Sequence, residues 1–398
     1  MTKKYVPWVN YFIVTGFVVF QFLLQTVAGI MAKAWMVDFQ LDRAQVGYLS
    51  SVFFISYVLL QIPVGLLYDR YGVRKVLNIA ALLLVCGIWG LAYSANYSQA
   101  LASRVLMGAG SAFGFVGMLY VTAAWFRPKY FALLIGIAET IALLGVALGE
   151  VMMAYLVQCY GWQITLKIAG VFALLLCMLV FCFIKDRPRR KKNIIKQPTY
   201  GKHKLRLILG NGRLWLAALY GFATVSIVNV FATMWSIPYL LQKYPAISLR
   251  MSGFVSSMVF IGIAIGGPTN AWLSQRYAIR RQVLILFAAI TAILFSIMLF
   301  LPLSYGWMII VCIFLGFFSS TYIQIFAVVK EGATKETQGA SLATANMILM
   351  SSAPILQSLT GWILSKQISY EHTFLIINVL LYMAILFAWR LGDKSVRP

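Results

Sequence analysis

The stretch Gly65-Leu-Leu-Tyr-Asp-Arg-Tyr-Gly-Val-Arg-Lys-Val-Leu77 lies between two long apolar runs and is the best guide to the fold. It holds one acid and three cations, and such a basic interval is typical of a cytoplasmic loop between two membrane helices. Gly72 can adopt the positive φ of a tight turn, and Gly65 would let a neighbouring backbone approach closely. Asp69 needs another explanation, because acids contribute little to membrane topology.

The composition is that of a membrane protein. Of the 398 residues, 62% are hydrophobic and 11% are charged, and the net charge is +23. Nucleic acid is not an expected partner, because the cations lie between apolar runs and no soluble basic domain is present. The five cysteines form no C-x-x-C pair, and the sequence has only two histidines. We therefore expect no metal site, no cofactor and no enzymatic activity.

Twelve stretches are long and apolar enough to cross a bilayer, for which a helix needs about 20 residues. They predict an all-α membrane protein with helices over residues 9–31, 46–68, 76–94, 99–122, 131–157, 164–185, 214–240, 251–274, 282–301, 306–329, 339–364 and 372–390. If the N-terminus is cytoplasmic, 26 of the 33 Lys and Arg residues fall on the cytoplasmic side and 5 on the other. This excess predicts two cytoplasmic termini, and the short loops favour a bacterial inner membrane.

The sequence predicts two halves of six helices each. Residues 186–213 form the longest loop, which is rich in Lys and Arg, and we interpret it as a flexible linker on the cytoplasmic face. It separates an N-terminal half, 1–185, from a C-terminal half, 214–398. The halves repeat weakly, since Asp69-Arg-Tyr-Gly-Val-Arg-Lys75 aligns with Gln275-Arg-Tyr-Ala-Ile-Arg-Arg281, 206 residues later. Two related halves are what alternating access by rocking requires.

The opening stretch resembles the G-x-L-x-D-R-x-G-R-R/K-x-x-L signature between helices 2 and 3 of the major facilitator superfamily. Val73 replaces the first basic residue of that signature, while the glycines, the acid and the other cations are in register. The resemblance implies the twelve-helix fold of that superfamily, with a latch between its two pseudo-symmetric halves on the cytoplasmic side. By resemblance, the gating residues are Gly65, Asp69, Arg70, Gly72 and Arg74.

Three ionisable residues within predicted spans are candidates for proton coupling, because charges are costly inside a bilayer. They are Arg104, Glu139 and Glu150. Arg104 begins Arg-Val-Leu-Met-Gly-Ala-Gly110, which resembles the R-x-x-x-G-x-G element of helix 4 in the superfamily. Arg104 and Glu150 should lie at similar depth on antiparallel helices, so we expect them to pair. Such a pair is either static, or its carboxylate takes a proton while the substrate competes for the arginine.

Polar side chains within the spans are candidates for binding a solute. In the superfamily, helices 1, 4, 7 and 10 line the cavity, and Glu139 aligns with Asn346 in the repeat, which favours a cavity position for both. Interhelical hydrogen bonding is the alternative role for each hydroxyl. The candidate substrate ligands are Tyr11, Thr15, Gln21, Gln25, Arg104, Tyr220, Thr224, Asn229, Gln324 and Asn346. Amides, hydroxyls and one arginine suit a small polar solute with an anionic group.

The resemblance implies a secondary active transporter that works by alternating access. We expect proton-coupled symport of an organic acid or an amino acid-like metabolite, with the solute, protons and membrane lipids as partners and a monomer as the working unit. The alternative is proton-coupled efflux of drugs or of a metabolite such as a siderophore. Drug antiporters of the superfamily carry G-x-x-x-G-P-x-x-G-G in helix 5, where this chain has Glu150 in place of the proline. That departure weakens the prediction of drug efflux.

Overall fold

The computed structural model describes residues 5–186, 207–277, 279–334 and 337–391, and these residues form helices and turns without any strand. Twelve helices among them are long and apolar enough to cross a membrane, which confirms the predicted all-α membrane fold. Most of the predicted linker, residues 187–206, lies outside the described residues. The first six spans are α1 (Val6–Asp38), α2 (Arg43–Tyr71), α3 (Val73–Ala92), α4 (Tyr97–Trp125), α5 (Phe131–Tyr160) and α6 (Trp162–Phe183).

Three of the last six spans are interrupted. The seventh consists of α8 (Gly212–Ser226), the π-helical η2 (Ile227–Trp235) and α9 (Ser236–Lys243), and the eighth and ninth are α10 (Leu249–Arg276) and α11 (Arg280–Phe300). The tenth consists of α12 (Tyr305–Ser319), the 3₁₀-helical η3 (Ser320–Gln324) and α13 (Ile325–Gly332), the eleventh of α14 (Gln338–Met350) and α15 (Ser352–Ser365), and the twelfth is α16 (Tyr370–Arg390). Departures from α-helical geometry are frequent at functional sites.

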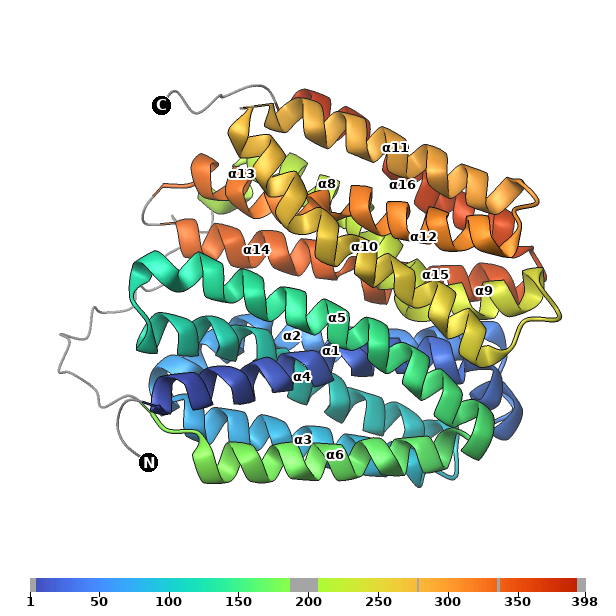
Figure 1. Cartoon of the computed structure of the whole chain (residues 1–398), viewed down its shortest axis with the longest axis horizontal. Helices are drawn as coiled ribbons and strands as arrows, with labels where there is room; N and C mark the ends of the chain where they lie inside the picture. The colour runs from blue at the N-terminus through green and yellow to red at the C-terminus, as the bar shows by residue number, and fades with distance from the viewer. Residues whose placement is uncertain (1–4, 187–206, 278, 335–336, 392–398) are drawn as a thin grey trace.

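The spans form two groups that lie side by side. In Figure 1, α1–α6 fill one side of the bundle and α8–α16 fill the other. We call the interface between these groups the seam. We call the end of the bundle at which α1 begins and α16 ends the N-side, and the other end the opposite side. Helix α2 begins on the opposite side, where the Asp42 carboxylate accepts from the Gln45 N–H at 2.7 Å and the Gln45 side chain accepts from the Asp42 N–H at 2.9 Å. This capping box fixes where the helix begins.

The seam is tightly packed on the opposite side, where α2 contacts α15 and α5 contacts α10. A Cβ atom on Gly47 would lie 2.7 Å from the carbonyl oxygen of Gln357 and 3.1 Å from the Cα of Gly361. One turn further along, the hydroxyl groups of Ser51 and Ser358 are 2.8 Å apart. Small residues let the two backbones approach this closely.

The predicted turn forms where expected, although one of its glycines acts differently. Helix α2 ends at Gly72, whose φ of 81° is in the region that favours glycine, and α3 follows directly. A Cβ atom on Gly65, in contrast, would meet nothing within 4 Å. The close backbone approach that we predicted at Gly65 is therefore absent, and α2 makes its close contact with the other group at Gly47.

The same cation contact occurs in each group of helices on the N-side. Arg74, near the start of α3, donates to the carbonyl of Phe181 in α6 at 3.4 Å. Arg281, near the start of α11, donates to the carbonyl of Trp389 in α16 at 2.9 Å. In both groups the arginine thus joins the third span to the end of the sixth, although the alignment pairs Arg74 with Arg280, one position before Arg281.

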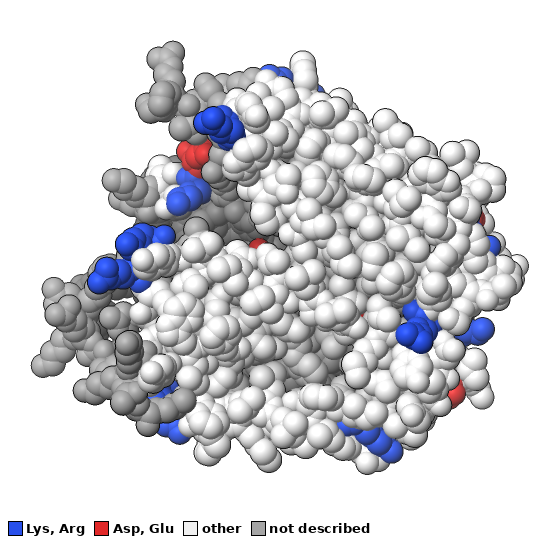
Figure 2. Space-filling model, viewed as in Figure 1, with Lys and Arg blue, Asp and Glu red and all other residues white. Residues whose placement is uncertain are grey.

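The surface has the charge distribution of a membrane protein. Figure 2 shows Lys and Arg gathered toward the two ends of the bundle, with uncharged side chains covering the band between them. Large apolar side chains such as Leu148, Phe181 and Leu386 are more than 60% exposed there. An apolar band of this kind is stable only in contact with lipid. Between the two groups the surface is hollowed toward the N-side.

The packing of α10 on α12 yields a first prediction. Helix α12 meets α10 at Gly316, where a Cβ atom would overlap the carbonyl of Val259, while a Cβ atom on Gly306 of the same helix meets nothing within 4 Å. Replacing Gly316 with Ala should lower the free energy of unfolding by about 1–3 kcal/mol through overpacking, whereas Gly306→Ala should not. Thermal unfolding of the purified variants in detergent measures both, and equal melting temperatures would contradict this account of the contact.

Candidate functional site

A group of polar side chains lies at the seam around the middle of α2. Tyr57 and Gln61 are one turn apart and share a face of that helix. The Gln61 Oε1 atom accepts from the Asn346 Nδ2 atom of α14 at 3.2 Å, and this bond joins the two groups of helices. The Glu139 carboxyl group of α5 lies within electrostatic range of the hydroxyl groups of Tyr57 and of Tyr322 in η3, without a hydrogen bond to either. We call these five residues the seam cluster.

The seam cluster is partly open. Tyr57 is 3% exposed, while the other four members are half-buried and Gln61 Nε2 has no hydrogen-bond partner among the described residues. The cluster thus offers hydroxyl groups, amide groups and one carboxyl group within reach of a small molecule. Such a set can bind a polyhydroxylated solute and can hold a proton. Two predicted residues, Glu139 and Asn346, lie in it.

Glu150 is enclosed at the seam on the opposite side. Its side chain is fully buried, and neither carboxyl oxygen has a hydrogen-bond partner among the described residues. It lies beside the Ser256 hydroxyl of α10, which is itself bonded to Ser236 and to the carbonyl of Ala232. Ala154, one turn on, packs against Gly253 of α10. A carboxylate in such a place would be a buried charge without a counter-ion, which is costly.

The predicted pair between Arg104 and Glu150 is not present. The Arg104 guanidinium donates to the carbonyl oxygens of Leu24, Leu49 and Ser50, each at 3.3 Å, and lies over the Phe53 ring at 4.7 Å. In the described residues the only ion pair within 4.0 Å joins Arg280 to Glu331. The expectation failed because Arg104 faces α1 and α2, whereas Glu150 faces α10. Arg104 holds helices together and is not open to a solute in this structure.

Four of the predicted substrate ligands form hydrogen bonds within their own group of helices. The Tyr11 hydroxyl donates to the carbonyl of Leu134, and the Tyr220 hydroxyl donates to that of Leu284. Thr15 and Thr224 each donate to a carbonyl of their own helix, at the residue four positions earlier. All four side chains are almost fully buried. We therefore revise their role, because the interhelical or local hydrogen bond, which was our alternative for hydroxyl groups, accounts for them.

The four remaining amide side chains differ in the hydrogen bonds that they make. The side chain of Asn229, in η2, donates to Ser352 at 3.0 Å. The backbone carbonyl of Asn229 accepts from the Gln357 side chain at 2.6 Å. Gln324 donates to the carbonyl of Asn270 at 3.0 Å. Gln21 is fully buried against Gly114, and neither of its amide atoms has a partner among the described residues. Gln25 is half-buried one turn away on the same helix. Gln21 and Gln25 remain candidates for contact with a solute.

The predicted gating loop is anchored to its own group of helices. The Asp186 carboxylate accepts from the Arg74 N–H at 3.1 Å and lies against Gly72. This joins the end of α6 to the start of α3. Asp69 and Arg70 are exposed at the end of α2, and the Arg70 guanidinium lies 5.1 Å from the centre of the Tyr71 ring. Their role as a latch between the halves stays a prediction.

Sequence reasoning missed three residues. Tyr57 and Gln61 escaped notice because α2 is not among the helices that line the cavity in the superfamily, and because neither residue is charged within the span or recurs in the sequence repeat as Glu139 and Asn346 do. A glutamine one turn after a tyrosine within an apolar span was the available signal, since a buried amide needs partners. Asp186 was counted within the linker and gave no signal of its own. Within the described residues, no group of three or more His, Cys, Asp or Glu side chains could hold a metal ion.

The sequence pattern that defines the Major Facilitator Superfamily matches residues 13–356 of this chain and, in a second match, residues 224–398. The chain belongs to this superfamily. It is a transporter with twelve membrane-spanning helices, and its bacterial relatives indicate a bacterial inner-membrane protein.

Two curated relatives span nearly the whole chain. The hexuronate transporter of Bacillus subtilis (strain 168) is 22% identical over 411 residues, which cover 100% of this chain and 96% of the relative. The probable galactarate/D-glucarate transporter GudP of Escherichia coli (strain K12) is 25% identical over 414 residues, which cover 94% of this chain and 90% of GudP. Among solved structures, a D-xylose-proton symporter has a TM-score of 0.81 at 15% identity, over 98% of this chain and 99% of that one. This last likeness shows a shared fold.

The separation of Arg104 from Glu150 yields a second prediction. Because each side chain contacts a different set of helices, Arg104→Gln and Glu150→Gln should act on stability independently. Arg104→Gln leaves three buried carbonyl oxygens without their donor and should lower stability by about 1–3 kcal/mol or more. Glu150→Gln replaces a partnerless carboxyl group with an amide of the same shape and should cost less. The changes in unfolding free energy of the two single variants should add up to that of the double variant within about 0.5 kcal/mol. A larger coupling energy would show that Arg104 and Glu150 do interact.

Proposed function

We propose that this transporter is a proton-coupled symporter that imports a small hydroxylated organic acid by alternating access, with its N-side in the cytoplasm. The relatives named for hexuronate and for galactarate/D-glucarate support this substrate class. The positive-inside count supports the orientation. In this proposal the protein works as a monomer, with the solute, protons and lipids as its partners.

The observation that carries the proposal is the position of Glu139 in the seam cluster. Its carboxyl group lies among hydroxyl and amide groups from both sides of the seam, beside Tyr57 and Tyr322 and near the bond between Gln61 and Asn346. Hydroxyl groups of a sugar acid can bond to the tyrosines and the amides. A carboxyl group at such a depth is a functional candidate by default.

Glu139 couples the proton to the solute through charge repulsion. If an ionised Glu139 faced the carboxylate of the solute, two negative charges would share one poorly hydrated site, and two carboxylates so placed hold a proton between them. Binding of the anionic solute therefore requires that Glu139 be protonated. The proton enters with the solute from the opposite side and leaves on the N-side after the solute has been released.

Alternating access requires the seam to open on the opposite side. The contact at Gly47 and Gly361 and the bond between Ser51 and Ser358 would then break. Glu150 would gain access to water at the same time, because it lies in the same part of the seam between α5 and α10. We propose that it binds a proton before the seam closes, so that a neutral acid is enclosed. Arg104 fixes α4 against α1 and α2 and has a positioning role.

The N-side closes when the opposite side opens. We propose that Asp69 and Arg70 then join the two halves, 1–185 and 214–398, and that Gly65, where a Cβ atom would meet none of the described residues within 4 Å, lets the halves approach each other. Gly72 and Arg74 keep the loop in place through Asp186. The residues of the linker, 186–213, allow the two halves to tilt.

Uptake into proteoliposomes tests the proposal. With an acidic exterior, the purified protein should accumulate D-glucuronate or D-glucarate, and collapse of the pH gradient by a protonophore should abolish the accumulation. Failure to transport either acid, or net export driven by an inwardly directed proton gradient, would contradict the proposed function. Export of a drug or a siderophore in the same assay would establish the alternative.

The variant Glu139→Gln tests whether the solute can cross the membrane without a coupled proton. Because the amide needs no proton to accept an anionic neighbour, the variant should lose less of its exchange of labelled for unlabelled D-glucarate than wild type does as the pH rises. It should no longer accumulate the acid, whereas wild-type uptake should fall as the external pH rises. Glu371→Gln, the same change near the start of α16, is the control and should behave as wild type. Accumulation by Glu139→Gln would show that the proton is coupled elsewhere.

A further inference from the structure

We infer that a pocket around Arg43 on the opposite side is a first binding site for the carboxylate group of the solute, and that binding there loosens the closed seam. The inference rests on the proposed function, since it assumes an organic acid that arrives from the opposite side. The pocket lies apart from the seam cluster and shares no residue with it.

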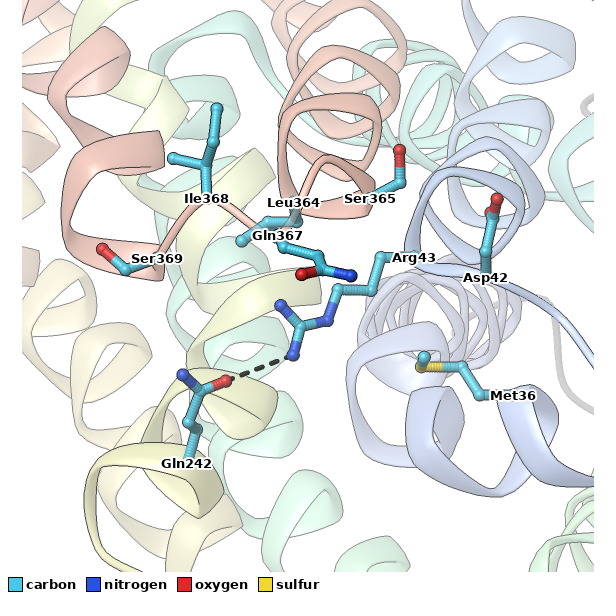
Figure 3. Close-up of a pocket in the computed structure, with 9 residues that line it drawn as sticks. All are labelled: Met36, Asp42, Arg43, Gln242, Leu364, Ser365, Gln367, Ile368 and Ser369. Carbon is cyan, nitrogen blue, oxygen red and sulfur yellow. Dashed lines mark hydrogen bonds between the residues drawn. The ribbon is translucent and has the colours of Figure 1, made fainter.

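The pocket is built from both sides of the seam. It has a volume of about 430 Å³ and is lined by Met36, Asp42, Arg43, Gln242, Leu364, Ser365, Gln367, Ile368 and Ser369. Figure 3 shows the Arg43 side chain extending into it from the start of α2, with Gln242 and Gln367 beside the guanidinium group. The volume is ample for a solute of six carbon atoms, and the pocket is open on the surface.

Arg43 brings a positive charge that no neighbouring carboxylate neutralises. Asp42 is directed away from the guanidinium group in Figure 3, and its carboxylate is occupied in the capping bond to Gln45. In the part of the chain that the structure describes, no carboxylate lies within 4.0 Å of Arg43. A guanidinium group offers a fork of N–H donors that matches a carboxylate. A hydroxylated acid is therefore the class of ligand that fits, with its carboxylate in place of Gln242 at the guanidinium group and a hydroxyl group on the Gln367 amide.

The turn between α15 and α16 carries the Gln367 amide that faces the pocket. Gln367 has a φ of 63°, in the left-handed region that residues other than glycine rarely adopt. The backbone of this turn is thus held in an unfavourable conformation at the edge of the pocket. Strained positions of this kind cluster at binding sites and switches.

Arg43 also holds the seam closed. Its Nη2 atom donates to Gln242 of α9 at 3.3 Å, and its guanidinium group lies 5.3 Å from the centre of the Tyr370 ring of α16. Both partners belong to the other group of helices. A carboxylate that takes the guanidinium group replaces the bond to Gln242, so the ligand competes with a contact that keeps the opposite side shut. The arriving solute would thus favour the opening through which it passes.

Initial-rate uptake of D-glucuronate from the opposite side tests the inference. Arg43→Gln should raise the KM about tenfold or more, since it removes both the charge and the fork of N–H donors, while Arg43→Lys should raise it less. The KM for efflux of solute loaded on the N-side should stay near that of wild type. Lys366→Gln is the matched control, because Lys366 lies on the same turn over Trp362, outside the residues that line the pocket.

Gln242→Ala distinguishes a binding site from a simple latch. This variant loses the hydrogen bond between Arg43 and Gln242 but keeps the Arg43 guanidinium group. The KM for uptake should therefore be unchanged or lower. If Arg43→Gln and Gln242→Ala shift the KM in the same direction, or if Arg43→Gln leaves it unchanged, the inference is wrong. Where wild type transports no organic acid at all, the proposed function fails instead. An unchanged melting temperature of each variant shows that the protein has folded.

Discussion

The arrangement of the two groups of helices depends on the close approach of α2 and α15 at Gly47 and Gly361. In a membrane, lipid chains are as apolar as leucine, so helices associate through packing and hydrogen bonds and not through exclusion of water. A glycine contact supplies such packing without interlocked side chains that would have to be disengaged. The seam is therefore tight on the opposite side and still able to separate, as a transporter requires.

Much of this fold could be predicted because a bilayer restricts a chain so strongly. Every backbone group must be satisfied within the span, so apolar length alone located twelve helices. The turn at Gly72 followed from the conformational freedom of glycine. The π-helical stretch Ile227–Trp235 could not be predicted, because its hydrogen-bond pattern depends on contacts such as those of Asn229 with Ser352 and Gln357. Those partners lie more than a hundred residues further along the chain.

The candidate site was harder to predict, because depth in the membrane does not give direction. Arg104 and Glu150 were placed at similar depth from the sequence, but one faces α1 and α2 and the other faces α10. Glu139 and Asn346 were found because a polar group recurs at that position in the repeat. Tyr57 and Gln61 were missed because their helix is not among those that line the cavity in the superfamily, although α2 lies at the centre of the seam.

The two acids of α5, one half-buried and one fully buried, suggest how one helix connects proton binding with tilting. Glu139 and Glu150 are separated by eleven residues, about three helical turns and about 16 Å, so both lie on one face of α5. That face lies along the seam, with Glu139 near the hollowed N-side and Glu150 in the closed opposite side. In the proposed cycle both acids meet water when the opposite side is open, and closure of that side encloses Glu150 while Glu139 gains access to the N-side. An acid enclosed without a cation is least costly when neutral, so closure favours a proton on Glu150, whereas Glu139 can release its proton on the N-side.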